Sequence, residues 1–275
     1  MTRLPQSAAS ANAAWYDSLP LGAYLDGAPH LKHPSLRIYY SSLVQRVFRI
    51  ATQHTPEPRV LDLGAGEGSV TIPFLALGAL VTAVDVSSRQ LDGLVERCAL
   101  YESSLELRCG DVQEVIAQIR QSTVRYDVVV ANSFLHHIPD YVELLRQAVP
   151  VLTPSGVIFT FQDPLFFSRL GIFTRSFGAI GYFAWRLGRP DRFGGVARRI
   201  RRIFGIYHAD SQEDNAEYHV VRGGVDDHLI EAELRNLGFQ VEVIRYFSAQ
   251  LAIWQWMGTA LGLQNTFAVI ASRGA

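Results

Sequence analysis

The sequence predicts an α/β protein whose core is a parallel sheet covered by helices. Strand and helix patterns alternate from residue 60 to residue 161, and a glycine cluster, Gly64-Ala65-Gly66-Glu67-Gly68, separates the first strand from the helix that follows it. Glycines there let the backbone turn sharply and let a ligand approach the main chain closely. With 275 residues, 48% of them hydrophobic, the chain can bury a core of this size.

The residues before the glycine cluster are expected to cap the core. Residues 1–14 are small and polar and lack the apolar centre of a signal peptide, so we expect a loose tail. Apolar residues then recur at helical spacing from Leu36 to Phe48, and Thr55-Pro56-Glu57-Pro58 marks the end of that helix. The sequence thus predicts an N-terminal tail and cap helices over residues 1–55.

Five strands are predicted in the region of alternation. Each is a short run of apolar, β-prone residues, and helical patterns fill most of the intervals between them. The predicted strands cover residues 60–63, 80–84, 105–108, 126–131 and 157–161.

The alternation stops at Leu165 and resumes at Gly223. The intervening stretch has no strand pattern, is aromatic and rich in arginine, and predicts helical pieces near 165–187 and 191–204. Three interpretations are left open: a lid over an apolar substrate pocket whose arginines bind an anionic group, an interfacial helix on an anionic membrane, or an oligomer interface or helical cap with a solvated basic face.

After this stretch the sequence predicts the rest of the sheet. Asp226 and Asp227 favour the N-terminus of a helix, and strands follow over 240–246 and 266–271 with an apolar helical segment near 251–261 between them.

The total charge and the cysteines limit the partners. A net charge of −1 gives no sign of a nucleic-acid partner. Cys98 and Cys109 are too few for a disulfide framework and have no metal-ligand spacing, so we expect a reducing cytoplasm and no bound metal. No apolar run reaches the roughly 20 residues that span a bilayer.

Polar residues follow four of the predicted strands. In an open α/β sheet, ligands bind outside the carboxyl ends of the strands, where these residues would gather. Asp85 is placed to accept hydrogen bonds from the ribose hydroxyls of a nucleoside, and Asp111 to accept one from an adenine amino group. The residues at these ends are Asp62, Asp85, Asp111, and Asn132 with His136 and His137.

These motifs together resemble those of the class I S-adenosylmethionine-dependent methyltransferases, in particular the branch that acts on small molecules and lipids. Val60 to Gly68 is similar to the first motif of the family, and Asp85, Gly110-Asp111 and Asn132 to Asp140 fall on the next three. A nicotinamide-dependent dehydrogenase would space its glycines as Gly-x-Gly-x-x-Gly, whereas Gly64, Gly66 and Gly68 are evenly spaced here.

The resemblance implies a Rossmann-like, seven-stranded sheet with helices on both faces, whose last strand is antiparallel, and a helical insert after strand five. On this basis residues 56–164 would form the cofactor-binding core, 165–222 a helical lid or insert, and 223–275 the C-terminal part of the core sheet.

The resemblance also implies the cofactor S-adenosyl-L-methionine. Gly64 and Gly66 would lie against its methionine part. Asp85 would bind the ribose, and Asp111 with Val112 would bind the adenine. Tyr16 resembles a tyrosine that closes over the cofactor in such enzymes, although a tyrosine packed in an N-terminal helix remains an alternative. The full set of expected cofactor-binding residues is Tyr16, Asp62, Gly64, Ala65, Gly66, Asp85, Val86, Asp111, Val112, Asn132, Ser133 and His137.

The expected activity is in-line methyl transfer to O, C or N of a small hydrophobic molecule, with or without an anionic group, such as a natural product, terpenoid, quinone or lipid. Alignment of the reactants supplies most of the catalysis, and a base is needed only for a poor nucleophile. Alternatives are a cofactor-binding protein that catalyses a non-methylating reaction such as a cyclisation, and a lipid methyltransferase at the membrane surface; a homo-oligomer also stays open. The candidate catalytic residues are His137, His208, Tyr218 and His219, and for His137 the alternative is a histidine that structures its loop or forms part of the substrate wall.

Overall fold

The computed structural model describes residues 8–18, 20–188 and 218–273. They form one seven-stranded sheet in the order β3-β2-β1-β4-β5-β7-β6. Strands β1 to β5 run parallel, and β7 lies antiparallel between β5 and β6. The expected seven-stranded sheet with an antiparallel last strand is confirmed. The strands are β1 Arg59–Leu63, β2 Leu80–Asp85, β3 Leu105–Cys109, β4 Tyr126–Asn132, β5 Leu152–Pro164, β6 Gln240–Tyr246 and β7 Thr266–Ser272.

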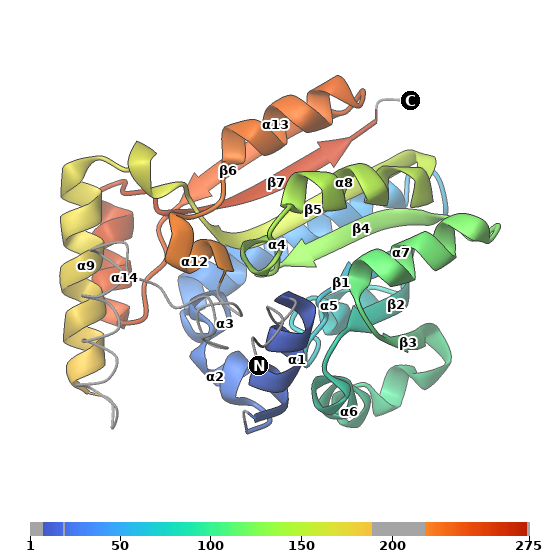
Figure 1. Ribbon diagram of the computed structural model, residues 1–275, viewed down its shortest axis with the longest axis horizontal. Coiled ribbons are helices and arrows are strands. Elements are labelled where there is room, and N and C mark those ends of the chain that lie inside the picture. The colour runs from blue at the N-terminus through green and yellow to red at the C-terminus, as the bar shows by residue number, and fades with distance from the viewer. Residues whose placement is uncertain (1–7, 19, 189–217, 274–275) are drawn as a thin grey trace, which may run out of the picture.

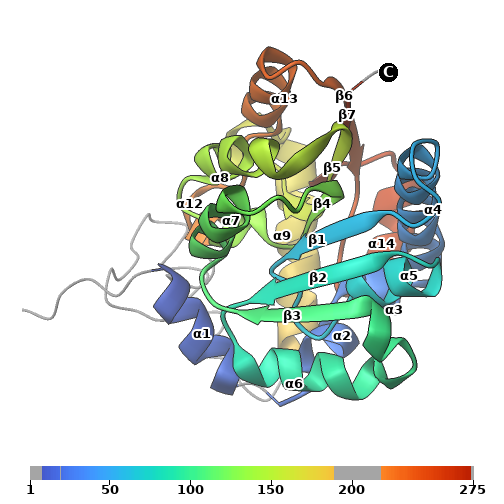
Figure 2. The same ribbon diagram turned by 90° about the vertical axis from the view of Figure 1, so that its right-hand side faces the viewer.

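Helices cover both faces of this sheet (Figures 1 and 2). One face packs against α7, α8 and α13, and the other packs against α4, α5 and α6. The buried positions of β1 and β4 are mostly apolar, as expected for strands covered on both faces, and Asp62 and Asn132 are the buried polar exceptions. The helices on these faces are α4 Pro34–Ala51, α5 Thr71–Ala76, α6 Ser88–Arg97, α7 Val112–Gln121, α8 Tyr141–Ala148 and α13 Asp227–Asn236.

The remaining helices lie at the carboxyl edge of the parallel strands or beside it (Figure 1). They are α1 Ala8–Ser18, α2 Ala23–Gly27, α3 Pro29–Lys32, α9 Ile172–Leu187, α12 Tyr218–Arg222 and α14 Ala252–Ala260. Of the short 3₁₀ turns, η2 Leu135–His137 and η4 Phe167–Arg169 follow the carboxyl ends of β4 and β5, whereas η1 Ala99–Ser104 and η3 Val149–Val151 lead into the amino ends of β3 and β5. The helical piece expected near 165–187 corresponds to η4 and α9, and the piece expected near 191–204 lies outside the described residues.

Two expectations about element boundaries were wrong. The N-terminal tail was expected to be loose through Ala14, but a helix, α1, begins at Ala8. Its alanines are the best helix formers, and Ala11 is fully buried where α1 packs against α6. Strand β5 is also longer than the five residues expected, because it continues through Pro164 as the partner of β7.

Candidate functional site

The glycine turn after β1 is pinned to the end of β2. The amides of Gly64 and Ala65 both donate to the carbonyl oxygen of Val84, at 2.9 and 3.0 Å, and the amide of Gly66 donates to Asp85 Oδ2 at 2.8 Å. Gly64 and Gly66 have φ of 72° and 52°, the left-handed region that favours glycine. The turn therefore holds a fixed shape at the carboxyl edge of the sheet.

At Gly64 the backbone also lies directly against an aromatic ring. A Cβ added at Gly64 would lie 2.1 Å from Cδ2 of Phe134, a residue of the loop after β4. At Gly66, by contrast, an added Cβ would meet only Gln90 Oε1, at 3.8 Å. The first glycine thus allows close packing, and the second leaves space at the turn.

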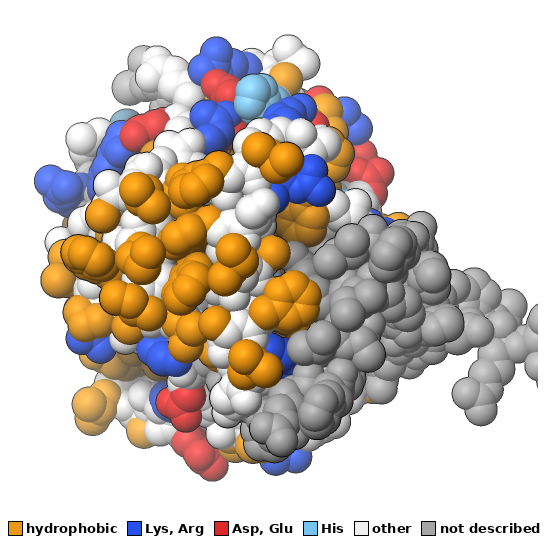
Figure 3. Space-filling model, turned by 90° about the vertical axis from the view of Figure 1, so that its left-hand side faces the viewer, with side chains coloured by type: hydrophobic (Ala, Val, Ile, Leu, Met, Phe, Trp, Pro, Cys, Tyr) orange, Lys and Arg blue, Asp and Glu red, His pale blue; other side chains and the backbone are white. Residues whose placement is uncertain are grey.

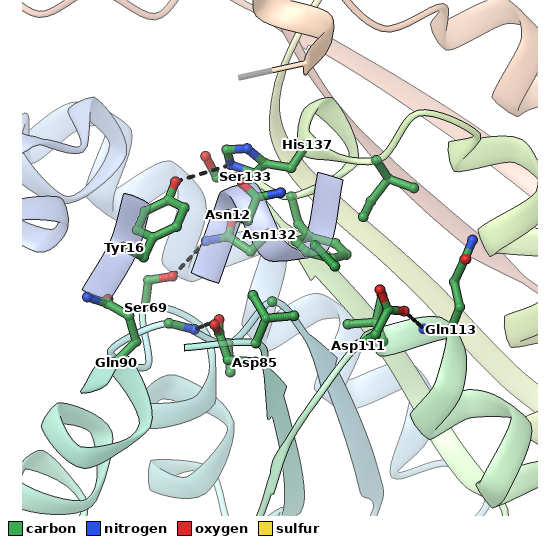
Figure 4. A pocket seen from close by; sticks show the side chains of 18 of the residues that line it. Asn12, Tyr16, Ser69, Asp85, Gln90, Asp111, Gln113, Asn132, Ser133 and His137 are labelled. Atoms are coloured by element: carbon green, nitrogen blue, oxygen red, sulfur yellow. Dashed lines mark hydrogen bonds between the residues drawn. The ribbon is translucent and has the colours of Figure 1, made fainter. Parts of the chain in front are cut away.

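A cavity of about 270 Å³ opens beside this turn, at the carboxyl ends of β1, β2, β3 and β4 (Figure 4). Its lining is mixed, with carboxylates and amides beside aliphatic and aromatic side chains. The lining residues are Ala9, Asn12, Tyr16, Gly64, Ala65, Gly66, Ser69, Asp85, Val86, Gln90, Asp111, Val112, Gln113, Asn132, Ser133, Phe134, His137, Ile138 and Pro139.

Almost all residues that the sequence singled out for a cofactor lie around this one cavity. Tyr16, Gly64, Ala65, Gly66, Asp85, Val86, Asp111, Val112, Asn132, Ser133 and His137 line it. Asp62 does not. Its side chain is fully buried in β1, where Oδ2 accepts a hydrogen bond from Thr71 Oγ1 at 2.5 Å.

Several lining residues were missed in the sequence. Ala9 and Asn12 lie on α1 with Tyr16, and their spacing of three and four residues is the helical signal that would have placed them on one face. Ser69 accepts a hydrogen bond from Asn132 Nδ2 at 2.8 Å, a contact between the segment after the glycine turn and the end of β4 that no local pattern shows. The other missed residues are Gln90, Gln113, Phe134, Ile138 and Pro139.

Asp85 is oriented by backbone amides. Oδ2 accepts from Gly66 N at 2.8 Å, and Oδ1 accepts from Ser87 N at 2.9 Å. Burial raises the pKa of Asp85, and these two amides oppose that rise. A carboxylate has about four lone-pair sites, so acceptor capacity is left for hydroxyl groups of a ligand in the cavity.

Asp111 has a similar arrangement at the end of β3. It is the N-cap of α7, and its Oδ1 accepts from Gln113 N at 2.8 Å. Asp111 and Gln113 lie together at one end of the cavity, on the far side of Asp85 from Tyr16 (Figure 4).

The opposite end of the cavity is bounded by Tyr16 and His137. The Tyr16 hydroxyl lies 3.2 Å from His137 Nε2, so α1 meets the loop after β4 across the cavity (Figure 4). Which of the two groups donates depends on the tautomer of the ring. His137 lines the cavity, and imidazole is a side chain that commonly serves as an acid or base near neutral pH.

Next to His137, the side chains of His136 and Asp163 form a buried pair. The Nδ1 of His136 lies 2.8 Å from Asp163 Oδ1, and the backbone amide of His136 donates to the same oxygen at 3.0 Å. Burial lowers the pKa of His136 to about 3 and raises that of Asp163 to about 7. His136 is therefore neutral, and its ring lies 4.0 Å from that of His137 between centroids.

The other candidate catalytic residues lie elsewhere. His219 Nε2 donates to the carbonyl oxygens of Ile138 and Pro139, at 2.9 and 3.1 Å, and so fixes the loop that carries them. The Tyr218 ring lies beneath the guanidinium of Arg222, 3.9 Å from its centroid. Neither residue lines the cavity, and His208 lies outside the described residues.

Part of the chain is similar in sequence to known methyltransferases. Residues 61–158 match the model of a family described as a methyltransferase domain. The chain is 30% identical over 160 residues to a ubiquinone biosynthesis O-methyltransferase of Xanthomonas campestris pv. campestris (strain B100). That match covers 58% of this chain and 59% of the relative.

Solved structures have a similar fold. A magnesium protoporphyrin IX methyltransferase from Synechocystis PCC 6803, crystallised with SAM, has a TM-score of 0.55 at 13% identity, with 100% of both chains covered. The cyclase SpnF has a TM-score of 0.57 at 13% identity, with 97% of this chain and 96% of that chain covered.

The match agrees with the resemblance of the sequence motifs to the class I S-adenosylmethionine-dependent methyltransferases. The matched residues 61–158 contain the glycine turn, Asp85, Asp111 and the loop after β4, which form most of the cavity. Among residues 8–18, 20–188 and 218–273, no group of three or more His, Cys, Asp or Glu side chains could hold a metal ion.

The contact between Gly64 and Phe134 can be tested by adding one methyl group. Gly64→Ala should lower the free energy of unfolding by about 3 kcal/mol, because backbone strain adds to the displacement of Phe134. Gly78→Ala is the matched control, since Gly78 has a φ of 94° but its added Cβ would meet nothing within 4 Å. Urea denaturation of both variants measures the difference; equal losses would contradict the close packing.

The buried carboxyl of Asp62 should make stability depend on pH. Burial raises the pKa of Asp62 to about 7. Since the folded state then binds this proton more tightly than the unfolded state, this group's contribution to stability falls as the pH rises from about 4 to about 7.

Asp62→Asn removes this titration. The free energy of unfolding of the native protein minus that of the variant should fall by about 2 kcal/mol between about pH 5 and about pH 7. Urea denaturation at both pH values checks this. A difference that is constant with pH would mean that Asp62 is ionised in the folded protein.

Proposed function

We propose that this protein transfers a methyl group from S-adenosyl-L-methionine to a small hydrophobic molecule. The observation that carries the proposal is the single cavity that gathers the glycine turn, Asp85, Asp111 and Asn132 at the carboxyl edge of the sheet. The chain spans about three fifths of the length of the Xanthomonas relative, 59%, and the activity named for that relative supports this proposal.

The residues around the cavity fit the parts of this cofactor. Asp85 would accept hydrogen bonds from the ribose hydroxyls, and Asp111 with Val112 would hold the adenine ring. The glycine turn and Asn132 would hold the methionine part. Asn132 Oδ1 is buried and has no hydrogen-bond partner among the described residues, which suits an acceptor that awaits a ligand's donor.

The acceptor molecule would enter at the end of the cavity bounded by Tyr16 and His137. Phe134, Ile138 and Pro139 give this end apolar walls, which suit a hydrophobic substrate. None of the arginines in the described part of the 165–222 stretch lines the cavity, so binding of an anionic group on the substrate stays a prediction. The loop of Ile138 and Pro139 is held by His219, which acts as a positioning residue.

We further propose that the acceptor atom is a hydroxyl oxygen, in keeping with the O-methyltransferase relative. The cofactor supplies a methyl group bonded to a sulfonium sulfur, and this sulfur leaves as a neutral thioether when the bond between it and the methyl carbon breaks. The substrate oxygen forms the new bond to carbon and loses its proton. His137 Nε2, which shares a hydrogen bond with Tyr16, is placed to accept that proton.

Transfer itself is tested by incubating the protein with methyl-labelled cofactor and lipophilic phenols, catechols and hydroquinones. Label should appear in the organic products. Tight cofactor binding with no transfer to any acceptor, including those in a cell extract, would contradict methyl transfer and favour a non-methylating reaction.

Asp85→Ala should weaken binding of the cofactor product S-adenosylhomocysteine about tenfold or more, because hydrogen bonds to a carboxylate are lost. Asp92→Ala is the control, since Asp92 is exposed on α6. Isothermal titration calorimetry compares the two, and circular dichroism verifies that both variants are folded. Unchanged affinity of Asp85→Ala for S-adenosylhomocysteine would contradict the proposal that Asp85 binds the ribose.

His137→Ala should slow methyl transfer to a phenol by roughly 100-fold or more at neutral pH, because a general base contributes about that much. Tyr16→Phe keeps the ring and should cost several-fold at most. His54→Ala, an exposed histidine after α4, serves as the control. Rates at increasing pH add a second readout: the loss should shrink as the phenol ionises, and a loss that does not change with pH would contradict the base.

A further inference from the structure

Helices α9 and α14 pack together at one end of the molecule (Figure 1). Trp254 of α14 donates from Nε1 to the carbonyl oxygen of Phe177 at 3.0 Å, and the two rings lie 5.6 Å apart between centroids. Gly181 allows this approach, because a Cβ there would lie 2.3 Å from Trp254 Cδ1. The two helices therefore form one rigid surface.

The outer side of this pair exposes large hydrophobic side chains. Phe173, Ile180 and Leu187 follow one another at seven-residue spacing and so share one side of α9. We define the apolar face as the exposed residues of the two helices and their ends, which are 54% to 86% exposed and form the broad hydrophobic area of Figure 3: Ile172, Phe173, Ile180, Leu187, Ile253, Trp256 and Leu261.

This grouping exceeds what scattered surface residues produce. Single exposed hydrophobic side chains are common on proteins, but a continuous patch marks a surface that binds something. No residue of α9 or α14 lines the cavity, so the apolar face does not form its wall.

The charges of the two helices favour an anionic partner. Neither α9 nor α14 contains an Asp or Glu, and α9 carries Arg175 and Arg186. A surface with aromatic and aliphatic side chains beside arginines suits the boundary between the headgroups and the acyl chains of an anionic bilayer. A second copy of the same face would bring arginines against arginines with no acid to pair them, which disfavours self-association.

We propose that the apolar face of α9 and α14 docks on the surface of an anionic lipid bilayer. The hydrophobic side chains enter the outer part of the acyl layer, and the arginines lie at the level of the lipid phosphates. The contact is peripheral: among the described residues, no helix is both long and apolar enough to cross a bilayer. The inference rests on this surface alone and does not depend on the proposed function.

Sedimentation with lipid vesicles tests the inference. The native protein should bind vesicles that contain phosphatidylglycerol more tightly than vesicles of phosphatidylcholine alone, and added salt should reduce the difference. The double variant Ile180→Glu, Trp256→Glu should bind at least about tenfold more weakly, because two exposed hydrophobic side chains no longer enter the lipid. Arg175→Gln should reduce the preference for the anionic vesicles.

The matched control is Ile38→Glu, Leu100→Glu, which changes two hydrophobic residues elsewhere that are even more exposed and should bind like the native protein. Circular dichroism shows that each variant is folded. The inference is overturned if the native protein binds neither vesicle, or if the double variant on the apolar face binds unchanged. Light scattering that shows a dimer which this variant makes monomeric would identify the face as an interface between copies instead.

Discussion

One carbonyl oxygen, that of Val84, receives the amides of both Gly64 and Ala65, and the geometry of the candidate site depends on this double hydrogen bond. It ties the end of β1 to the end of β2 after their parallel pairing has ended. The Gly66 amide is thereby directed at Asp85. A parallel sheet thus provides a rigid edge, and the turn converts that edge into a binding surface.

The polar contacts continue from this turn around the cavity. Asp85 accepts from the Ser87 amide, and the Ser87 hydroxyl meets Asp17 of α1 at 2.5 Å. One residue earlier in α1, Tyr16 reaches His137. The N-terminal helix is therefore attached on both sides of the space it covers, so strand ends, helix and loop act as one unit. Buried Glu67 adds a further tie, because its two oxygens accept from the amide of Gly22.

The sequence predicted the parts of this arrangement that depend on local pattern. Short apolar, β-prone runs predicted the strands and period-3.6 hydrophobicity predicted most helices. The residues at the strand ends predicted Asp85, Asp111 and Asn132 as site residues, because parallel strands end at one edge. The packing of Phe134 on Gly64 and the burial of Asp163 beside His136 could not be predicted, since each joins residues distant in the chain. The polarity of α1 concealed a helix that is held by tertiary contacts instead of an apolar stripe.

The position of β7 has a consequence for how this chain reaches its structure. Residues 266–272 pair with β5 on one side and with β6 on the other, so β6 joins the sheet only through β7. During synthesis, β5 has a free edge for about a hundred residues of further chain growth, and β6 has no place to pair. Such late, long-range closure is slow and leaves hydrophobic strands exposed, so the growing chain depends on its last strand for protection against aggregation.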